Sequence, residues 1–293
     1  MTALLGRALD SGARGSALKT VVYQSYRTTD VPGWISRSMQ TVREWAALKG
    51  FAYVFVDDRL FDYTPAWYRQ KVNNQIQLVS DLARLELARE FLLGEFERTI
   101  WVDADVVVFD ADRLEIDVTE EYAFCHEVWV EKLSFLRAAR RGLKGFRWGG
   151  VYCRRRVNNA VAVFTRGNSM LDFYIHACQR IVKNKRGDIS NLEVGTHFLT
   201  ELHRKFPLPL LRNIGLFSPH LMLDIATGGR RIAEIYLKEF GSPVWAANLC
   251  ASYANKEYEG LTVGDDAYHT VLDRLLETGG KAVNGELTSA REP

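Results

Sequence analysis

The chain has 293 residues, of which 47% are hydrophobic and 12% aromatic, so it holds enough apolar side chains for one well-packed globular domain. Its 38 Lys and Arg residues nearly balance its 36 Asp and Glu residues, and the net charge of +2 argues against nucleic-acid binding driven by bulk charge. The four cysteines are widely separated, with no CxxC pair and no zinc-ligand spacing. We therefore expect reduced thiols and a cytoplasmic location.

The sequence shows no segment typical of a signal peptide or a membrane span. Gly, Asp and Arg interrupt the first residues, and no apolar run reaches the length of about 18 residues that a spanning helix needs. We expect no transmembrane segment, while peripheral membrane association stays open. Residues 1–18 are rich in Gly, Ser and Ala and are expected to be flexible.

The first half of the chain alternates between strand and helix patterns. Apolar, β-branched runs predict strands at 19–26, 51–58 and 98–109, and helical spacing predicts helices at 34–50 and 70–93. This alternation is typical of an α/β domain with a mostly parallel sheet. Ligands of such sheets bind where the strands reach their carboxyl ends.

The second half of the chain is less regular. Its patterns predict strands, helices and extended segments that alternate less strictly. These lie at 122–130, 158–167, 168–184, 189–205, 210–219, 244–253 and 265–277. We expect two halves, over 19–115 and over 116–277, followed by a disordered polar tail over 278–293.

Two aspartates, Asp103 and Asp105, stand one residue apart at the end of a predicted strand. Hard divalent cations prefer carboxylate oxygens, and a cation held there could neutralise a departing diphosphate. Asp57 ends the preceding strand, so these acids should converge on one crevice. Short acidic patterns also occur by chance, and a solvated strand end stays open as an alternative.

A second charged pair, Asp81 and Arg84, lies on the helix before this strand. The two residues are three apart and therefore share a helix face. They could form a structural salt bridge, or they could hold sugar hydroxyls and phosphate beside a metal.

The segment SDLAR, placed before an apolar strand that ends in DxD, resembles the sugar-binding-region glycosyltransferases of family 32. These enzymes are related to family 8 and to the clostridial glucosylating toxins. The resemblance implies a GT-A-like nucleotide-diphospho-sugar transferase fold, in which helices flank a Rossmann-like, mostly parallel sheet. It also implies a metal-dependent, retaining hexosyltransferase that uses Mn²⁺ or Mg²⁺, a UDP- or GDP-sugar donor and a glycan or other acceptor, with polysaccharide biosynthesis as its setting.

The resemblance also assigns roles to the two halves, with nucleotide-sugar binding in 19–115 and acceptor binding with a C-terminal metal motif in 116–277, and to individual residues. In the family pattern the helix pair contacts the donor sugar, and the DxD aspartates bind manganese and diphosphate. NLCASY resembles the family's H-x-x-x-S-W, with Asn in place of His and Tyr in place of Trp, so Asn248 is the expected third metal ligand and His220 its rival. Glu193 is expected to lie near the reacting sugar and to act with Asp81 and Arg84 in catalysis. The expected cofactor-binding residues are Tyr23, Gln24, Tyr26, Asp57, Asp81, Arg84, Asp103, Ser252 and Tyr253.

Two other functions stay open. DADVV fits the nucleophile motif of a phosphatase of the haloacid dehalogenase type, with Asp103 attacking phosphorus, Asp105 as acid/base, Thr165 in the second motif and 263–266 in the fourth. A non-catalytic sugar- or nucleotide-binding module would keep the fold without an intact metal site.

Two further segments carry expectations of their own. Trp67 and Tyr68 follow Pro65 in a predicted loop, where we expect rings that face a substrate. The basic run Arg154, Arg155 and Arg156 is expected to be a solvated surface, and an anionic acceptor facing it stays open as an alternative.

Overall fold

The computed structural model describes residues 18–285, except 117, 119, 134 and 141–149. Of the segment expected to be flexible, 1–18, all but Leu18 lies outside the described residues. Within the described part of the chain, no helix has both the length and the apolar character needed to cross a membrane.

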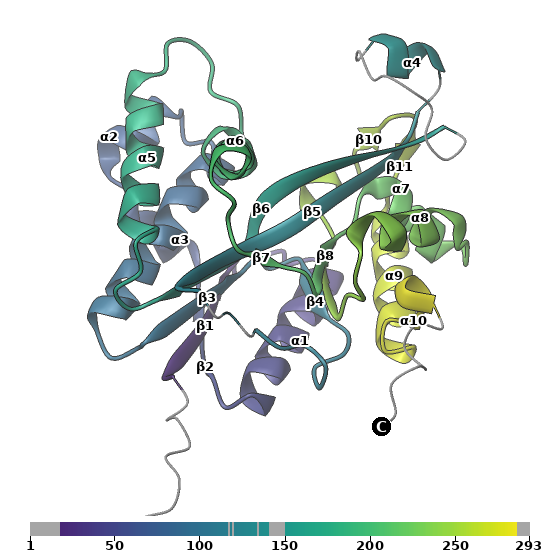
Figure 1. Ribbon diagram of the computed structural model, residues 1–293, viewed down its shortest axis with the longest axis horizontal. Helices are drawn as coiled ribbons and strands as arrows, with labels where there is room; N and C mark the ends of the chain where they lie inside the picture. The colour runs from purple at the N-terminus through teal and green to yellow at the C-terminus, as the bar shows by residue number, and fades with distance from the viewer. Residues whose placement is uncertain (1–17, 117, 119, 134, 141–149, 286–293) are drawn as a thin grey trace, which may run out of the picture.

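A six-stranded sheet forms the centre of the protein (Figure 1). Its strand order is β2-β1-β3-β6-β5-β7, and β6 alone runs antiparallel to its neighbours. This confirms the expected α/β class and the mostly parallel sheet flanked by helices. The strands are β1 (Thr20–Ser25), β2 (Ala52–Val56), β3 (Arg98–Val102), β5 (Tyr122–Lys132), β6 (Val151–Thr165) and β7 (Leu210–Leu211).

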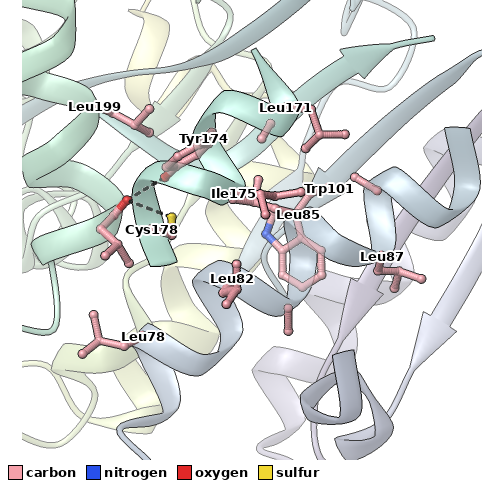
Figure 2. Close-up of a cluster of buried hydrophobic side chains, with 14 of the residues drawn as sticks. Leu78, Leu82, Leu85, Leu87, Trp101, Leu171, Tyr174, Ile175, Cys178 and Leu199 are labelled. Atoms are coloured by element: carbon pink, nitrogen blue, oxygen red, sulfur yellow. Dashed lines mark hydrogen bonds between the residues drawn. The ribbon is translucent and has the colours of Figure 1, made fainter. Parts of the chain in front are cut away.

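Helices cover both faces of this sheet because its strands alternate two apolar sets of side chains. On one face, Val22 and Ile100 share a core with Trp45 of α1 (Gly33–Leu48). The opposite face carries Trp101, which packs with α3 (Ile76–Leu93) and α5 (Leu171–Asn184). Figure 2 shows Trp101 beside leucines of α3 and side chains of α5. Burying each large apolar side chain stabilises the fold by about 1.5–3 kcal/mol.

A second core lies beside the outer half of β5 and β6. There, helices from the last third of the chain pack on Val128, Val130 and Val151. Two small sheets complete the fold: β4 (Val106–Val108), β9 (Ala246–Asn248) and β8 (Ile214–Leu216) form one, and β10 (Glu257–Tyr258) and β11 (Leu261–Thr262) form the other. The remaining helices are η1 (Asp58–Tyr63), α2 (Ala66–Lys71), α4 (Phe135–Arg140), η2 (Glu193–His197), α6 (Phe198–Lys205), α7 (Pro219–Ala226), α8 (Arg231–Phe240), η3 (Ala251–Tyr253), α9 (Asp265–Glu277) and α10 (Lys281–Asn284).

Three boundaries differ from those predicted. The helix predicted over 70–93 is broken, because Asn73 and Asn74 adopt the left-handed backbone conformation that asparagine tolerates. The prediction of a disordered tail from residue 278 is wrong as far as residue 285. The side chain of Asn284 is buried and makes two hydrogen bonds to the backbone of Val244. Strand β6 begins at Val151 and therefore includes the three arginines of the basic run.

Candidate active site

The two aspartates Asp103 and Asp105 lie in the short connection between β3 and β4. The backbone N–H of Asp103 donates to the carbonyl of Ala160 at 2.8 Å, which ties this connection to β6. Strand β4 leaves the main sheet and pairs with β9, with Val106 opposite Asn248. The chain therefore turns between two sheets at the aspartates, and the Asp103 side chain stays 28% exposed.

Asp103 is joined to the charged pair of α3. Its Oδ1 accepts from Trp101 Nε1 at 2.7 Å and from Arg84 Nη1 at 3.0 Å. The Arg84 guanidinium also pairs with Asp81 at 2.9 Å, donates to the Asn159 carbonyl at 3.0 Å and lies over the Trp101 ring. Because the Arg84 side chain is only 8% exposed, its main role here is to fix both carboxylates in place.

Asp105 is held by the turn that follows β9. Its Oδ1 accepts from Asn248 Nδ2 at 2.7 Å, and its Oδ2 accepts from the N–H of Ala251 at 2.7 Å. The Asn248 amide nitrogen also lies 3.5 Å from Asp103 Oδ2, while the amide oxygen accepts from the N–H of Cys250 at 2.7 Å. Asn248 is therefore an N–H donor between the two carboxylates, and not an oxygen ligand, in this arrangement.

The electrostatics of this site favour a cation. Burial raises the pKa of Asp105 to about 7, and the Asp103 carboxylate beside it acts in the same direction. Burial also raises the pKa of Asp103, and that of Asp81 to about 6, although Arg84 lowers both. When all three carboxylates are ionised, they face the single positive charge of Arg84, so a positive ion near Asp103 and Asp105 would relieve their repulsion.

The donor set at the aspartates fits a hard divalent cation. Asp103 and Asp105 offer carboxylate oxygens, the ligands that Mn²⁺ and Mg²⁺ prefer. Within the described parts of 18–285, no group of three or more His, Cys, Asp or Glu residues could hold a metal. Two carboxylates suit a cation that shares its remaining positions with phosphate oxygens and water.

A β-bulge in β6 brings Asn159 to this site, which sequence analysis did not predict. Phe124 pairs with Ala162, whereas the next residue, Cys125, pairs with Asn158, so residues 159–161 have no partner on β5. The Asn159 amide donates to Asp81 Oδ1 at 2.9 Å. Bulges of this kind redirect side chains beside active sites.

Gly195 of η2 packs against the side chain of Asp81. A Cβ atom at Gly195 would lie 2.9 Å from Asp81 Oδ2 and 3.2 Å from Asn159 Oδ1. Glycine is therefore required for this close approach of backbone to carboxylate.

Gly195→Ala should destabilise the protein by about 1–3 kcal/mol, because two buried polar side chains must move to admit the methyl group. Urea unfolding followed by circular dichroism measures this loss. Gly264→Ala is the matched control, since the nearest atom to its added Cβ is 3.7 Å away. Equal stability of the two variants would contradict the close packing of η2 on Asp81.

Tyr23 and Gln24, two of the expected nucleotide-binding residues, lie beneath the site. Both are fully buried; the Tyr23 hydroxyl donates to the Arg84 carbonyl at 2.8 Å, and Gln24 Nε2 donates to the Asp103 carbonyl at 3.1 Å. They support the backbone of the charged residues. Tyr26 is half-buried, and the Asp105 carboxylate contributes to the raised pKa of its hydroxyl, behind the larger effect of burial.

Asp57 and Glu193 each pair with a basic side chain other than Arg84. Asp57 directly precedes η1. Its carboxylate accepts from the backbone N–H of Arg59 at 2.9 Å and pairs with the guanidinium of the same residue at 2.8 Å. Glu193 pairs with Lys185 at 2.6 Å. These contacts argue against a direct role of either carboxylate at a metal held by Asp103.

Ser252, Tyr253 and His220 complete the set of expected site residues. Ser252 and Tyr253 lie in η3, directly after Ala251, and Tyr253 packs on Trp129 with ring centroids 5.3 Å apart. His220 lies on α7 with its ring 6.2 Å from that of Tyr258, and the carboxylates that influence its pKa are Glu131 and Glu259, not the aspartate pair.

The two aromatic residues Trp67 and Tyr68 do not form the expected substrate-facing pair. Tyr68 is fully buried in α2, so that expectation is wrong for this residue. Trp67 is exposed and lines an open surface hollow of about 440 Å³ with Gln70, Lys71 and Lys183. None of the aspartate-site residues lines this hollow.

Comparisons with known proteins give structural neighbours alone. No protein-family model matches the chain, and no curated protein sequence matches it. Mouse xyloside xylosyltransferase 1 in its apo form is 11% identical over 80% of this chain and 98% of that chain, with a TM-score of 0.38. A glycosyltransferase involved in the glycosylation of the major capsid of PBCV-1 is 7% identical over 79% of this chain and 94% of that chain, with a TM-score of 0.36. A197 from STIV is 12% identical over 64% of this chain and 78% of that chain, with a TM-score of 0.27. Because all three TM-scores are low, the function proposed below rests on the geometry of the site.

Proposed function

We propose that this protein is a metal-dependent glycosyltransferase of GT-A type, which transfers a hexose-type sugar from a nucleotide diphosphate sugar to a glycan or another acceptor. One observation carries the proposal. Asp103 and Asp105 lie partly exposed at the carboxyl end of β3, and the buried Arg84 joins Asp103 to Asp81. The carboxyl ends of parallel strands are where α/β sheets bind ligands.

The charged residues have separate roles in this proposal. Asp103 and Asp105 would hold Mn²⁺ or Mg²⁺, which when bound supplies positive charge to a departing diphosphate. Arg84 fixes the direction of the Asp103 carboxylate through its hydrogen bond at 3.0 Å. Asn159 and Gly195 hold Asp81 on the donor-sugar side of the pair.

The proposal includes retention of the anomeric configuration of the transferred sugar, which the resemblance of SDLAR and DxD to family 32 implies. On a front-face route, the bond between the anomeric carbon and the diphosphate oxygen breaks, the new glycosidic bond forms on the same face, and the acceptor hydroxyl passes its proton to the leaving phosphate oxygen. No protein base is then needed, which fits a site whose carboxylates are committed to Arg84, Asn248 and backbone N–H groups.

The phosphatase alternative is weaker because its motifs do not come together. Thr165 pairs with Arg98, at the opposite end of β3 from Asp103. Asp265 begins α9, where it accepts hydrogen bonds from Trp34 and Asn255. A haloacid dehalogenase site would need both residues beside the nucleophile. A non-catalytic binding module keeps the same geometry and differs only in turnover.

The proposal is tested by a thermal-shift screen of UDP, GDP, CDP and their sugars, with and without Mn²⁺. A ligand that binds the folded state alone, at 100 times its Kd, adds about 2.7 kcal/mol, or roughly 5 °C in a chain of this size. We expect one nucleotide to give a shift of this order with Mn²⁺ and little without it. Slow Mn²⁺-dependent hydrolysis of the matching nucleotide sugar would distinguish an enzyme from a binding module. Release of phosphate from simple phosphoesters, with no nucleotide shift, would contradict the proposal.

A further inference from the structure

Strands β5 and β6 form a long hairpin that runs outward from the central sheet toward β10 and β11 (Figure 1). Directly opposite residues of antiparallel strands project to the same face, and successive residues alternate between faces. The pairing places Glu127 opposite Arg156, Trp129 opposite Arg154, and Cys125 opposite Asn158. These residues, together with Glu131, form one polar face, here called the hairpin strip.

Arg155 lies on the other face of the hairpin. It pairs with Val128 across the strands, and its guanidinium contacts Glu239 of α8 at 2.9 Å. The basic run is therefore divided: Arg154 and Arg156 belong to the hairpin strip, whereas Arg155 does not. All three side chains keep contact with solvent, as expected, and each also pairs with a glutamate.

The hairpin strip begins at the aspartate site. Asn158 donates to Glu127 Oε2 at 2.9 Å, and the next residue, Asn159, donates to Asp81. On the other side, Ala251 donates to Asp105, and Tyr253 packs on Trp129 from the same short helix. The solvent-accessible part of the strip runs from Asn158 to Arg154, about 13 Å at the usual rise of a strand, because its β5 members are buried.

The charges on the hairpin strip cancel. Arg154 pairs with Glu131 at 2.8 Å, and the Arg156 guanidinium lies 3.6 Å from Glu127. Both carboxylates are buried, whereas the arginine side chains are 35% and 23% exposed, so solvent meets N–H donors and not negative charge. Partly exposed tyrosine rings, Tyr253 and Tyr258, lie beside them. Ring faces together with fixed N–H donors match the faces and hydroxyls of sugars.

We propose that the hairpin strip binds the acceptor, and that this acceptor is a neutral, hydroxyl-rich oligosaccharide chain. The proposal rests on the proposed function of the aspartate site. An accessible strip of about 13 Å is long enough for more than one sugar ring, so a chain gains contacts that a single sugar cannot make. Because each guanidinium has a carboxylate partner, the strip gives no electrostatic advantage to an acidic polymer.

The test uses the full chain with UDP and Mn²⁺ on a microarray of neutral and acidic oligosaccharides of one to six residues. The double variant Arg154→Gln/Arg156→Gln should lose roughly tenfold to hundredfold in apparent affinity for neutral chains, because two sets of donors are removed. Arg155→Gln is the matched control and should bind like the wild type. Arg154→Lys/Arg156→Lys keeps a positive charge opposite each buried glutamate, protecting the fold, but loses the planar donor pair, so it should also bind weakly.

Four results would overturn the inference: no oligosaccharide retained by the wild type, retention of acidic chains alone, equal binding of single sugars and long chains, or equal loss in Arg155→Gln. The nucleotide-dependent thermal shift, measured on the same variants, should not change. A wild-type protein that binds neutral chains but shows no nucleotide shift would contradict the proposed transferase function and leave the hairpin strip as a glycan-binding surface.

Discussion

Replacing Asp105 by asparagine should reduce Mn²⁺-dependent cleavage of the donor nucleotide sugar by about 10³-fold, the size of effect seen when one group that stabilises transition-state charge is removed. Asparagine keeps the volume of the side chain and can still accept from the N–H of Ala251, which the carboxylate meets at 2.7 Å. The variant therefore loses charge, a metal ligand and the acceptor for Asn248 Nδ2, which Asp105 meets at 2.7 Å, while it keeps the bond from Ala251. Initial rates of nucleotide release, followed at several Mn²⁺ concentrations, measure the loss.

Asp110→Asn is the control for this variant. Asp110 also follows a strand, β4, and its Oδ1 accepts from the N–H of Arg113 at 3.0 Å, within its own loop. Its replacement should leave the rate unchanged. A rate for Asp105→Asn close to that of the wild type would mean that the aspartate pair does not hold the metal.

Replacing Arg84 by glutamine should lower the free energy of unfolding by about 3–5 kcal/mol, because removing one partner of a buried ion pair leaves uncompensated charge. Here two carboxylates, Asp81 and Asp103, lose a shared counter-charge at 2.9 and 3.0 Å. Their pKa values should then rise further above those of the unfolded chain. The folded state binds more protons than the unfolded state between the two sets of pKa values, so stability falls as the pH rises. The loss should be larger at about pH 8 than at about pH 5.

Arg89→Gln gives the comparison within the same helix. Arg89 forms an ion pair with Glu86 at the same spacing of three residues, but its side chain is 43% exposed. Its loss should cost less than about 1 kcal/mol and depend little on pH. Urea unfolding of both variants at the two pH values separates the predictions, and a small, pH-independent loss for Arg84→Gln would show that the pair is not the electrostatic centre of the site.

Sequence patterns predicted the first half of the fold well, because strands such as β3 and helices such as α3 carry strong local periodicity. The meeting of Asp103 with Arg84 does not follow from the sheet pattern, because Arg84 lies within α3; the family resemblance is what linked the two residues. The break at Asn73 and the short helix α10 were missed, since a left-handed backbone residue and a four-residue helix leave little periodic signal.

The rest of the site depends on contacts between segments far apart in the chain. Asn159 reaches Asp81 through a bulge that no local sequence pattern predicts. The contact of Ala251 is made by its backbone N–H, so the residue type does not indicate it. Glu193 was chosen for its place in a segment, yet Lys185 lies close enough to pair with it. A single sequence shows which acids are present but not which cation each one meets.

Residues 159–161, which have no partner on β5, separate two registers of β6 against β5. Inward of them β6 follows β3 and the base of β5, and outward of them it carries Arg154 and Arg156. A deletion of one residue there would reverse which side chains lie on the hairpin strip, exchanging this pair for Cys153 and Arg155. Insertions and deletions at that point in homologues of this chain should therefore contain an even number of residues.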